Sequence, residues 1–567
     1  MTENIDFTAL TANPLFYRTY SRYKADGTKE SAREAKDRAI NGLKKFKLLT
    51  EEEVELITKY FYENKVFVSG RWFWVGGTEW VERQKNFIGA YNCASVPVTN
   101  WDAFRFNFRA LLMGCGVGTV VEQDKIEQLP EIKYPINLVE VTELGTNWKE
   151  GNPENDDSEW TAYSIDEDTL GIVYTVGDSK EGWVDVATDL LEFSSYNQEI
   201  PGFEYKKVNL YLDLSNVRPA GIQLKGFGGL SNPEKLEEGL KDIIKILNKA
   251  VGRKLNSLEV CKILGIHGVV TVAGNLRRSA RVNQGSPDDE HFTTSKDNLW
   301  VQGEDGKWKI DPERDMLRFG NHTNVYHAKP DLETITNAVR KQYYSGEGAI
   351  QYAPEAIARG NADLLDTEDK KRSFIALYCT NQQLAKQYFE HLTSELGLKV
   401  SDREIEHRLQ RYNGNPCMEI LGKSFLCCLS EVHLNVIDPH DTAQQLEAFK
   451  VAALSALPLL KHEFDVEDIQ YSREIDPIIG VSFTGLFDFF ANKFGSEWLE
   501  WWKTGRDRNF PKAQYFLDSE RICLELWKNQ VRETVEDFCK KHHIRQPNRY
   551  TTVQPAGCWN VDAVRVS

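Results

Sequence analysis

Segments typical of β-strands alternate with segments typical of α-helices along the middle of this chain. Residues 208–214 carry apolar side chains at every second position, the pattern of a half-buried strand. After a start signal at Asn232-Pro233, residues 236–247 carry one apolar stripe at helical spacing. The apolar run at residues 268–273 then predicts a buried strand. Strands alternating with helices form βα units around a parallel sheet, so we predict an α/β fold.

The first 90 residues or so differ from this pattern and predict a helical N-terminal region. Residues 31–43 and 50–63 carry apolar side chains at helical spacing, separated by charged residues. We therefore expect one domain at about 1–90 and a second at 91–567, with an acidic, exposed excursion within about 130–205.

Composition excludes several classes of protein. A formal charge of −16 over 567 residues argues against a duplex nucleic-acid binder, which usually has a basic face. The sequence has no apolar run long enough to span a bilayer and no basic start typical of a secretory signal, which predicts a cytoplasmic location. The ten cysteines are then expected to be thiols, and their spacing predicts no zinc site.

The segment Gly414–Ile420, with the sequence GNPCMEI, combines residue types suited to acid–base and redox chemistry. Pro416 disfavours a helical conformation for Asn415, so a loop is predicted. The Asn415 amide can both donate to and accept from a substrate hydroxyl, and Glu419 can act as a general base. A turn that holds a buried Cys417 is the alternative interpretation.

Further thiols lie at Cys93 and at the adjacent pair Cys427-Cys428. Adjacent cysteines rarely bond each other, because the ring that would form is strained. A partner elsewhere in the chain is more plausible, and Cys93 is a candidate if the fold brings it near.

Three segments are candidates for binding nucleotide phosphates. The glycine-rich run around Gly116 and Gly118 indicates either a phosphate loop or close backbone packing. Arg277-Arg278 follow the predicted strand at 268–273 and could hold phosphates or a base edge; a solvated pair is the alternative. Residues 550–557 offer hydroxyls and backbone amides, which would form an anion site if a helix began there.

In this order, the segments resemble the ribonucleotide reductases, most closely the monomeric adenosylcobalamin-dependent ribonucleoside-triphosphate reductases. The resemblance extends from about Arg18 to Gly557. It rests on a set of short motifs: Asn92-Cys93, Gly116-Val117-Gly118, Glu181-Gly182-Trp183, Asp213-Leu214-Ser215, Arg218-Pro219, Gly226-Phe227-Gly228-Gly229, Ala273 to Ala280, Asn415 to Ile420 and Thr551 to Gly557.

The resemblance implies a ten-stranded α/β barrel with a catalytic finger loop at about residues 411–432. Cys417 matches the cysteine that becomes a thiyl radical and removes the ribose 3′ hydrogen. Glu419 matches the base on the 3′ hydroxyl, and Asn415 the amide that holds the ribose hydroxyls. Cys93 matches one member of the reducing pair, and Cys427 matches the other better than Cys428 does.

The resemblance also implies nucleotide-binding segments. Thr551, Thr552 and Gly557 fall in the substrate-phosphate segment, and Arg277 and Arg278 in the loop that relays the effector to the substrate base. Gly116 and Gly118 are grouped with these binding residues. The excursion at 130–205 resembles an insertion that holds a deoxynucleotide effector.

The implied activity is reduction of ribonucleoside triphosphates with adenosylcobalamin and a thioredoxin-like reductant, by a monomer or by a chain paired with a separate C-terminal fragment. Two alternatives stay open: a class I-type large subunit, and an inactive fragment of an interrupted gene (by an intein, an intron or a split) that only binds nucleotide. The sequence after Gly557 does not resemble the family's continuation, and we expect the chain alone to be inactive.

Overall fold

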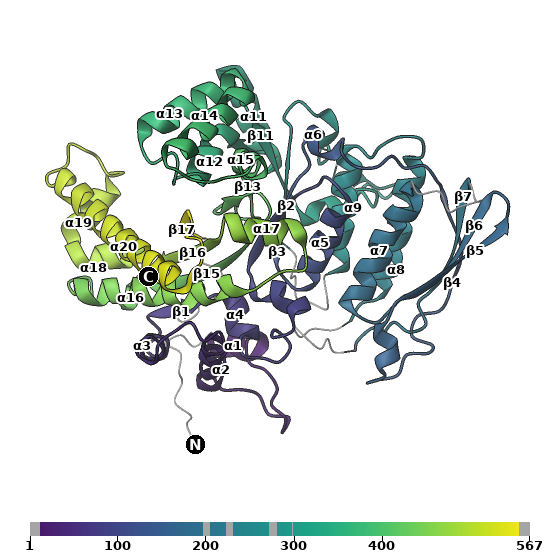
Figure 1. Cartoon of the computed structure of the whole chain (residues 1–567), viewed down its shortest axis with the longest axis horizontal. Coiled ribbons are helices and arrows are strands. Elements are labelled where there is room, and N and C mark those ends of the chain that lie inside the picture. Colours follow the sequence, from purple (N-terminus) through teal and green to yellow (C-terminus); the bar gives the residue numbers. More distant parts are fainter. Residues whose placement is uncertain (1–11, 197–204, 223–230, 272–279, 298, 555–567) are drawn as a thin grey trace. The chain divides into compact units, whose positions relative to one another are not determined.

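The computed structural model describes most of the chain, which divides into two compact units. The central unit comprises Cys93–Ser424, and the terminal unit combines Met1–Asn92 with Phe425–Ser567. The described residues are 12–196, 205–222, 231–271, 280–297 and 299–554 (Figure 1). The boundaries predicted for the two domains stay predictions, because this division into compact units joins the two ends of the chain and does not test them.

The described part of the central unit contains five parallel strands in the order β12-β11-β8-β3-β2. Each neighbouring pair is parallel, as expected for strands joined by helical crossovers. The predicted α/β class is therefore confirmed. The strands are β2 (Cys93–Pro97), β3 (Gly116–Val120), β8 (Arg281–Gly285), β11 (Asn321–Tyr326) and β12 (Ala349–Tyr352).

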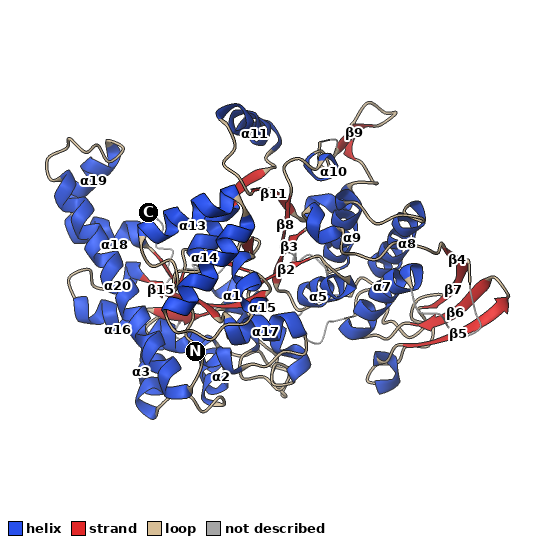
Figure 2. Ribbon diagram, turned by 45° about the horizontal axis from the view of Figure 1, so that its top comes forward, coloured by secondary structure: helices blue, strands red, loops and turns tan. Residues whose placement is uncertain are grey.

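A second sheet of four strands has the order β4-β7-β6-β5 and lies beside the helices α7 and α8 (Figures 1 and 2). The predicted strand at 208–214 is β7, in which every second side chain is buried. The predicted excursion includes β5, whose residues are all exposed. The bounds are β4 (Ile136–Val141), β5 (Glu159–Asp166), β6 (Thr169–Thr175), β7 (Lys207–Asp213), α7 (Lys180–Ser195) and α8 (Glu234–Lys249).

The prediction of a strand at residues 268–273 is wrong for the residues of this range that the structure describes. Residues 257–270 form the helix α9 (Ser257–Val270), and residues 272 and 273 lie outside the described range. The helix is buried on most sides, so its sequence shows no amphipathic period. A short apolar run of this kind does not distinguish a buried strand from a buried helix.

Four helices after β12 enclose a separate apolar core in the central unit. Phe374 and Phe389 stack at its centre, with ring centroids 4.7 Å apart. The last of these helices leads directly into the predicted finger loop. The helices are α12 (Ala353–Gly360), α13 (Glu368–Thr380), α14 (Gln382–Glu395) and α15 (Asp402–Leu409).

The terminal unit begins with the predicted helices, α2 (Ala32–Lys44) and α3 (Glu51–Tyr62). Ser31 and Thr50 each start a capping box, which satisfies backbone donors at the helix N-terminus. The unit's strands are β1 (Val66–Val68), β15 (Phe425–His433), β16 (Ile478–Thr484) and β17 (Arg549–Thr551). β15, β16 and β17 run parallel, and β1 is antiparallel to β15.

The larger helices of the terminal unit after β15 are α16 (Thr442–Ala456), α17 (Glu467–Ile475) and α20 (Ala513–His542). Other elements of the chain are α1 (Ala12–Thr19), α4 (Gly70–Val75), α5 (Trp101–Leu112), α6 (Gln123–Ile126), α10 (Glu290–Thr293), β9 (Trp300–Gln302), β10 (Trp308–Ile310), α11 (Leu332–Ser345), β13 (Asn413–Gly414), β14 (Leu421–Gly422), α18 (Leu486–Phe494) and α19 (Ser496–Lys503).

The helical N-terminal region is confirmed, whereas closure into a ten-stranded barrel stays a prediction. Within the described residues, no helix is both long enough and apolar enough to cross a membrane.

Candidate active site

Of the finger loop predicted at about 411–432, the part in the central unit is a short hairpin, here called the finger loop, whereas residues 425–432 belong to strand β15. β13 and β14 pair antiparallel, and the residues between them form the predicted loop. Inside it, Met418 N–H donates to Asn415 O at 2.9 Å, and Asn415 N–H donates to Ile420 O at 3.3 Å. Met418 has φ 59°, in the left-handed region that few non-glycine residues adopt. These bonds turn the chain sharply around Cys417.

Asn415 links the two ends of this loop through its side chain. Its Nδ2 donates to Glu419 Oε1 at 2.7 Å, and its Oδ1 accepts from Ile420 N–H at 3.2 Å. Asn415 is fully buried. Burial raises the pKa of the Glu419 carboxyl, and the hydrogen bond from Asn415 opposes that rise. The amide and the carboxyl therefore lie where a substrate hydroxyl could meet both.

Cys417 is exposed at the tip of the loop. Partial burial of its thiol, together with the charge of Glu419, raises the pKa of Cys417 to about 11. At neutral pH the sulfur therefore keeps its hydrogen atom. A thiol in this state is suited to donating a hydrogen atom rather than to acting as a thiolate nucleophile.

Cys93, the first residue of β2, lies in the same group of side chains. Burial raises the pKa of its thiol well above the ordinary value, and the charges of Glu419 and Cys115 act in the same direction. A hydrogen bond with Asn415 opposes this rise. The central unit thus brings four predicted residues together: Cys93, Asn415, Cys417 and Glu419.

Cys115 is a further thiol at this site that the sequence analysis did not single out. It is buried and interacts electrostatically with Cys93. Its neighbour Gly116 lies opposite Cys93 in the β2–β3 ladder. The register of two parallel strands brings Cys115 there, and a single sequence does not reveal that register.

The glycine-rich segment forms β3 and leaves room for the finger loop. A Cβ on Gly118 would lie 1.8 Å from Gly414 O, and one on Gly116 would lie 3.0 Å from Pro416 Cγ. Close backbone packing therefore accounts for these glycines, as one of the two alternatives predicted. Contact of Gly116 and Gly118 with nucleotide stays a prediction.

In the terminal unit, Cys427 and Cys428 point to opposite faces of β15 because strand side chains alternate. Phe483, opposite Val432 in β16, packs on Phe449 of α16, with ring centroids 6.5 Å apart. The even-numbered side chains of β15, Cys428 included, therefore face this helix. Burial raises the pKa of Cys428 to about 12, and the charge of a nearby arginine, Arg473, opposes that rise.

The odd-numbered side chains of β15 face the predicted phosphate segment. Glu431, on the same face as Cys427, accepts from Gln554 Nε2 at 2.9 Å. Gln554 N–H donates to Ser482 Oγ at 3.2 Å, and Thr552 N–H donates to Val481 O at 3.0 Å. Cys427 therefore shares a face of β15 with Glu431, which contacts residue 554, and the choice of Cys427 over Cys428 stays a prediction. Cys93 belongs to the other unit, so the pairing of Cys93 with Cys427 stays a prediction.

Other predicted binding residues have different outcomes. Thr551 ends β17 and Thr552 follows it, and no helix begins within the described residues 549–554. Arg277, Arg278 and Gly557 lie outside the described residues, so their predicted roles remain open.

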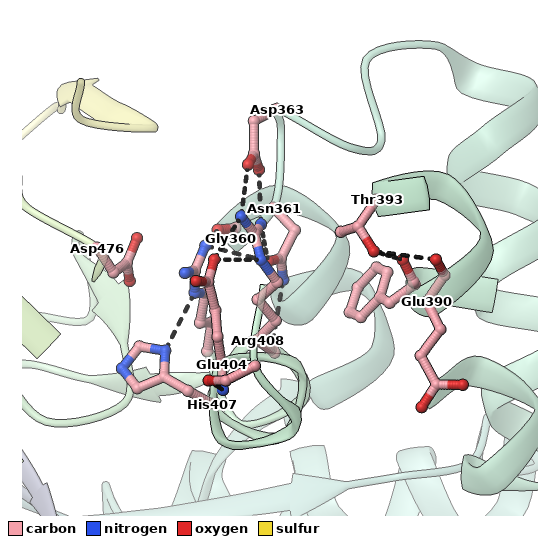
Figure 3. Close-up of polar contacts among 12 residues, drawn as sticks. Gly360, Asn361, Asp363, Glu390, Thr393, Glu404, His407, Arg408 and Asp476 are labelled. Atoms are coloured by element: carbon pink, nitrogen blue, oxygen red, sulfur yellow. Dashed lines mark hydrogen bonds and ion pairs between the residues drawn. The ribbon is translucent and has the colours of Figure 1, made fainter. Parts of the chain in front are cut away.

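A buried arginine network fixes the helix that precedes the finger loop (Figure 3). Arg408 of α15 is fully buried and contacts Glu404 at 3.1 Å and Asp363 at 2.8 Å. Although burial alone would raise it, the hydrogen bonds and charge of Arg408 hold the pKa of Asp363 below its usual value. Arg408 also donates to Asn361 Oδ1 at 3.2 Å. The sequence analysis missed this network, because its members are distributed over two helices and the loop after the first.

Comparisons with known proteins match the family suggested by these residues. Residues 146–247 match the family described as "B12-dependent ribonucleotide reductase, insertion domain", and overlap the predicted insertion. The adenosylcobalamin-dependent ribonucleoside-triphosphate reductase of Lactobacillus delbrueckii subsp. bulgaricus is 27% identical over 539 residues, which cover 89% of this chain and 64% of that protein. The enzyme of the same name from Levilactobacillus brevis is 30% identical over 553 residues, covering 89% of this chain and 63% of that protein.

Among solved structures, a B12-dependent (class II) ribonucleotide reductase aligns with a TM-score of 0.68 at 20% identity, covering 97% of this chain and 73% of the other. This match supports the fold. The chain spans less than two thirds of the length of the two Lactobacillales enzymes.

Proposed function

We propose that this chain belongs to the B12-dependent ribonucleotide reductases and reduces ribonucleoside triphosphates to 2′-deoxyribonucleoside triphosphates by thiyl-radical chemistry. One observation carries the proposal. A single unit holds Cys417 at the tip of a buried loop, with Glu419, Asn415 and Cys93 in interaction with one another. The set provides a hydrogen-atom donor, a base, an amide for hydroxyls and a reducing thiol.

In the proposed mechanism, Cys417 acts as the radical site. When bound, adenosylcobalamin supplies the radical that takes the hydrogen atom of the Cys417 thiol. Cys417 fits this role because its thiol is accessible and protonated at neutral pH. The sulfur radical of Cys417 then removes the 3′ hydrogen of the ribose and returns it at the end of the reaction.

Glu419 and Asn415 handle the ribose hydroxyls. Glu419 takes the proton of the 3′ hydroxyl as the 2′ hydroxyl leaves, a general-base step that requires the carboxylate form. Asn415 already donates to Glu419 at 2.7 Å, so it orients that carboxylate and can also hold a hydroxyl. Glu419 returns the proton when the ribose carbon is reduced.

Cys93 and Cys427 supply the reducing equivalents. Each thiol gives one proton and one electron, so the 2′ hydroxyl leaves as water, the 2′ carbon gains hydrogen and the two sulfurs become a disulfide. The high pKa of Cys93 keeps it protonated, as a proton donor must be. A thioredoxin-like dithiol then restores the thiols by exchange and is itself oxidised to a disulfide.

We further propose a deoxynucleotide effector bound by the segment at 146–247, and activity as a monomer. Support for the effector comes from the match of these residues to the insertion domain of the family. The charge of −16 disfavours duplex nucleic acid as a partner.

The test is reduction of the four ribonucleoside triphosphates with adenosylcobalamin and dithiothreitol. The assay uses the chain alone and the chain joined to the portion of a Lactobacillus enzyme that it does not match. We expect deoxynucleotide formation by at least one of these two proteins, and this activity should require cobalamin, be abolished by Cys417→Ser and persist in Cys379→Ser, which changes another exposed thiol.

Absence of product from both proteins, under conditions in which the intact Lactobacillus enzyme is active, would contradict the proposal. If Cys379→Ser and Cys417→Ser lost product formation equally, this result would contradict a specific role for Cys417.

A further inference from the structure

We propose that Gln284 and Gln351 form an amide clamp that fixes the finger loop and so positions Cys417; the catalytic meaning of this clamp rests on the proposed function. Both glutamines are buried and project from the parallel sheet, Gln284 from the central strand β8 and Gln351 from the edge strand β12. Neither residue belongs to the set that reacts with substrate. We assign them as positioning residues.

The clamp holds the backbone of the loop on both sides of Asn413. Gly414 N–H donates to Gln284 Oε1 at 2.7 Å. Gln351 Nε2 donates to Tyr412 O at 2.6 Å, and Gln284 Nε2 donates to the same oxygen at 3.3 Å. Gln284 Nε2 also donates to Gln351 Oε1 at 2.5 Å, which joins the two side chains.

The network admits one orientation of each amide. Because Gly414 N–H is a donor, the oxygen of Gln284 must face it, and the Gln284 amino group must then face Gln351. The Gln351 oxygen accepts that bond, which leaves its amino group directed at Tyr412 O. A closed network of this kind specifies one position of the loop, because any shift leaves a buried polar group without its partner.

Two further contacts restrict the same stretch. Gly118 of β3 approaches Gly414 O so closely that a Cβ would lie 1.8 Å from it. Tyr412 Oη donates to Glu122 Oε2 at 2.5 Å, and Glu122 Oε1 in turn bonds His327 Nε2 at 2.7 Å. Residues 412–414 are therefore held between three strands before the chain reaches Cys417.

A loosened clamp should change the chemistry of Cys417 in a measurable way. Its pKa of about 11 depends on partial burial and on the nearby Glu419. If the loop moves away from the sheet, both effects weaken and the pKa falls toward the ordinary value of 9.0. One unit of pKa changes the thiolate fraction at pH 8 about tenfold, and the thiolate is the form that reacts with alkylating reagents.

The test compares the rate of iodoacetamide alkylation at Cys417 in the whole chain, followed by peptide mass spectrometry. Gln284→Leu should raise this rate about tenfold at pH 8. Cys379, also exposed, serves as an internal reference whose rate should not change, and buried Cys261 reports unfolding. Gln445→Leu is the matched variant, since Gln445 is a buried glutamine of the terminal unit, and it should leave Cys417 unchanged.

The Gln284→Glu variant distinguishes a loss of the hydrogen bonds that position the loop from a simple loss of packing. One oxygen can still accept from Gly414, but the other meets Gln351 Oε1 and Tyr412 O unless it carries a proton. The Cys417 rate of this variant, divided by the wild-type rate, should therefore approach 1 at low pH and rise toward the Gln284→Leu ratio at high pH. A purely structural defect would give a ratio independent of pH.

Two results would overturn the clamp: a wild-type Cys417 rate in folded Gln284→Leu, or a Gln284→Glu ratio that equals the Gln284→Leu ratio at every pH. Neither readout needs nucleotide reduction, so failure of the clamp and failure of the proposed function are distinguishable. If the protein under test reduces nucleotides, Gln284→Leu should also lower the kcat of that reaction more than it raises its KM.

Discussion

Asn415 both anchors the finger loop and adjusts the pKa of Glu419, the base of the proposed reaction. Burial raises the pKa of Glu419, while the bond from Asn415 Nδ2 lowers it. The base works only as the carboxylate, so activity should decline as pH falls through this raised pKa. The position of that decline therefore reports the balance between burial and the Asn415 amide.

Asn415→Leu should move the acid side of the pH–activity profile to higher pH, because it removes the hydrogen bond that stabilises the Glu419 carboxylate. The measurement is kcat/KM for nucleotide reduction between pH 5 and 9. Asn413→Leu is the control, since Asn413 bonds Lys423 O rather than Glu419. Identical profiles for Asn415→Leu and wild type would contradict this role.

Glu431 should make the stability of the terminal unit depend on pH. Burial raises its pKa from 4.5 to about 7, and the bond from Gln554 opposes that rise. Between these pH values the unfolded chain has lost the proton while the folded chain keeps it. The contribution of Glu431 to stability should thus decrease as pH rises from 4.5 to 7, by about 3 kcal/mol.

Glu431→Gln should remove this dependence, so the variant gains about 3 kcal/mol relative to wild type between pH 4.5 and 8. The measurement is the free energy of unfolding in urea at both pH values. His433 Nε2 lies 3.7 Å from Glu431, and burial lowers the pKa of His433 to about 4. The stability that neutral His433 contributes is therefore lost as pH falls from 6.5 to 4. This effect is shared by both proteins to a first approximation. Exposed Glu447→Gln should show no such gain.

At the level of single elements, β3 needs glycines because the finger loop lies so close to it that larger side chains would clash. Gly118→Ala should destabilise the central unit by about 3 kcal/mol, because its Cβ would overlap the backbone oxygen of Gly414. In Gly116→Ala the nearest atom to the added Cβ is the side-chain Cγ of Pro416 at 3.0 Å, and the substitution should cost about 1 kcal/mol. Denaturant unfolding of both variants checks the order, and equal costs would contradict it.

The helix α15 depends on a buried ion pair network. Arg408→Met removes the cation that pairs with the buried carboxylate of Glu404 and the more exposed one of Asp363, which should cost about 3 kcal/mol. Arg359→Met in α12 removes an exposed pair with Glu355 and should cost less than about 0.5 kcal/mol. Urea unfolding measures both. A small loss in Arg408→Met would mean that the network does not hold this helix.

At the scale of the whole molecule, the cysteines divide into two classes of accessibility. Cys379 and Cys417 are exposed, and the other seven described cysteines are buried. Brief alkylation of the folded chain should therefore label these two among the described cysteines, whereas alkylation in denaturant should label all ten of the sequence. Rapid labelling of Cys93 or Cys427 in the folded chain would contradict the buried site.

Much of the architecture follows from periodicity. The alternation in β7 and the helical spacing of apolar residues in 31–43 and 50–63 predict their elements correctly, because the signals are local. Helix α9 was mistaken for a strand, because a helix buried on most sides lacks the polar face that reveals its period.

The site was predictable only in part. Cys417, Asn415 and Glu419 lie within one loop, so their proximity follows from the chain. The contacts of Gln284 and Gln351 with that loop join distant residues, and nothing in the local sequence of either glutamine indicates them.

The long reach of these contacts has a consequence for the order in which the chain is synthesised and folds. The bond from Gly414 to Gln284 joins residues 130 positions apart, and that from Tyr412 to Glu122 joins residues 290 apart. The ribosome must therefore release β3, β8 and β12 long before the segment that carries Cys417 emerges. Nascent chains expose the polar groups of Glu122 and Gln284 until that segment docks, so the reactive thiol joins a sheet that has already had time to form.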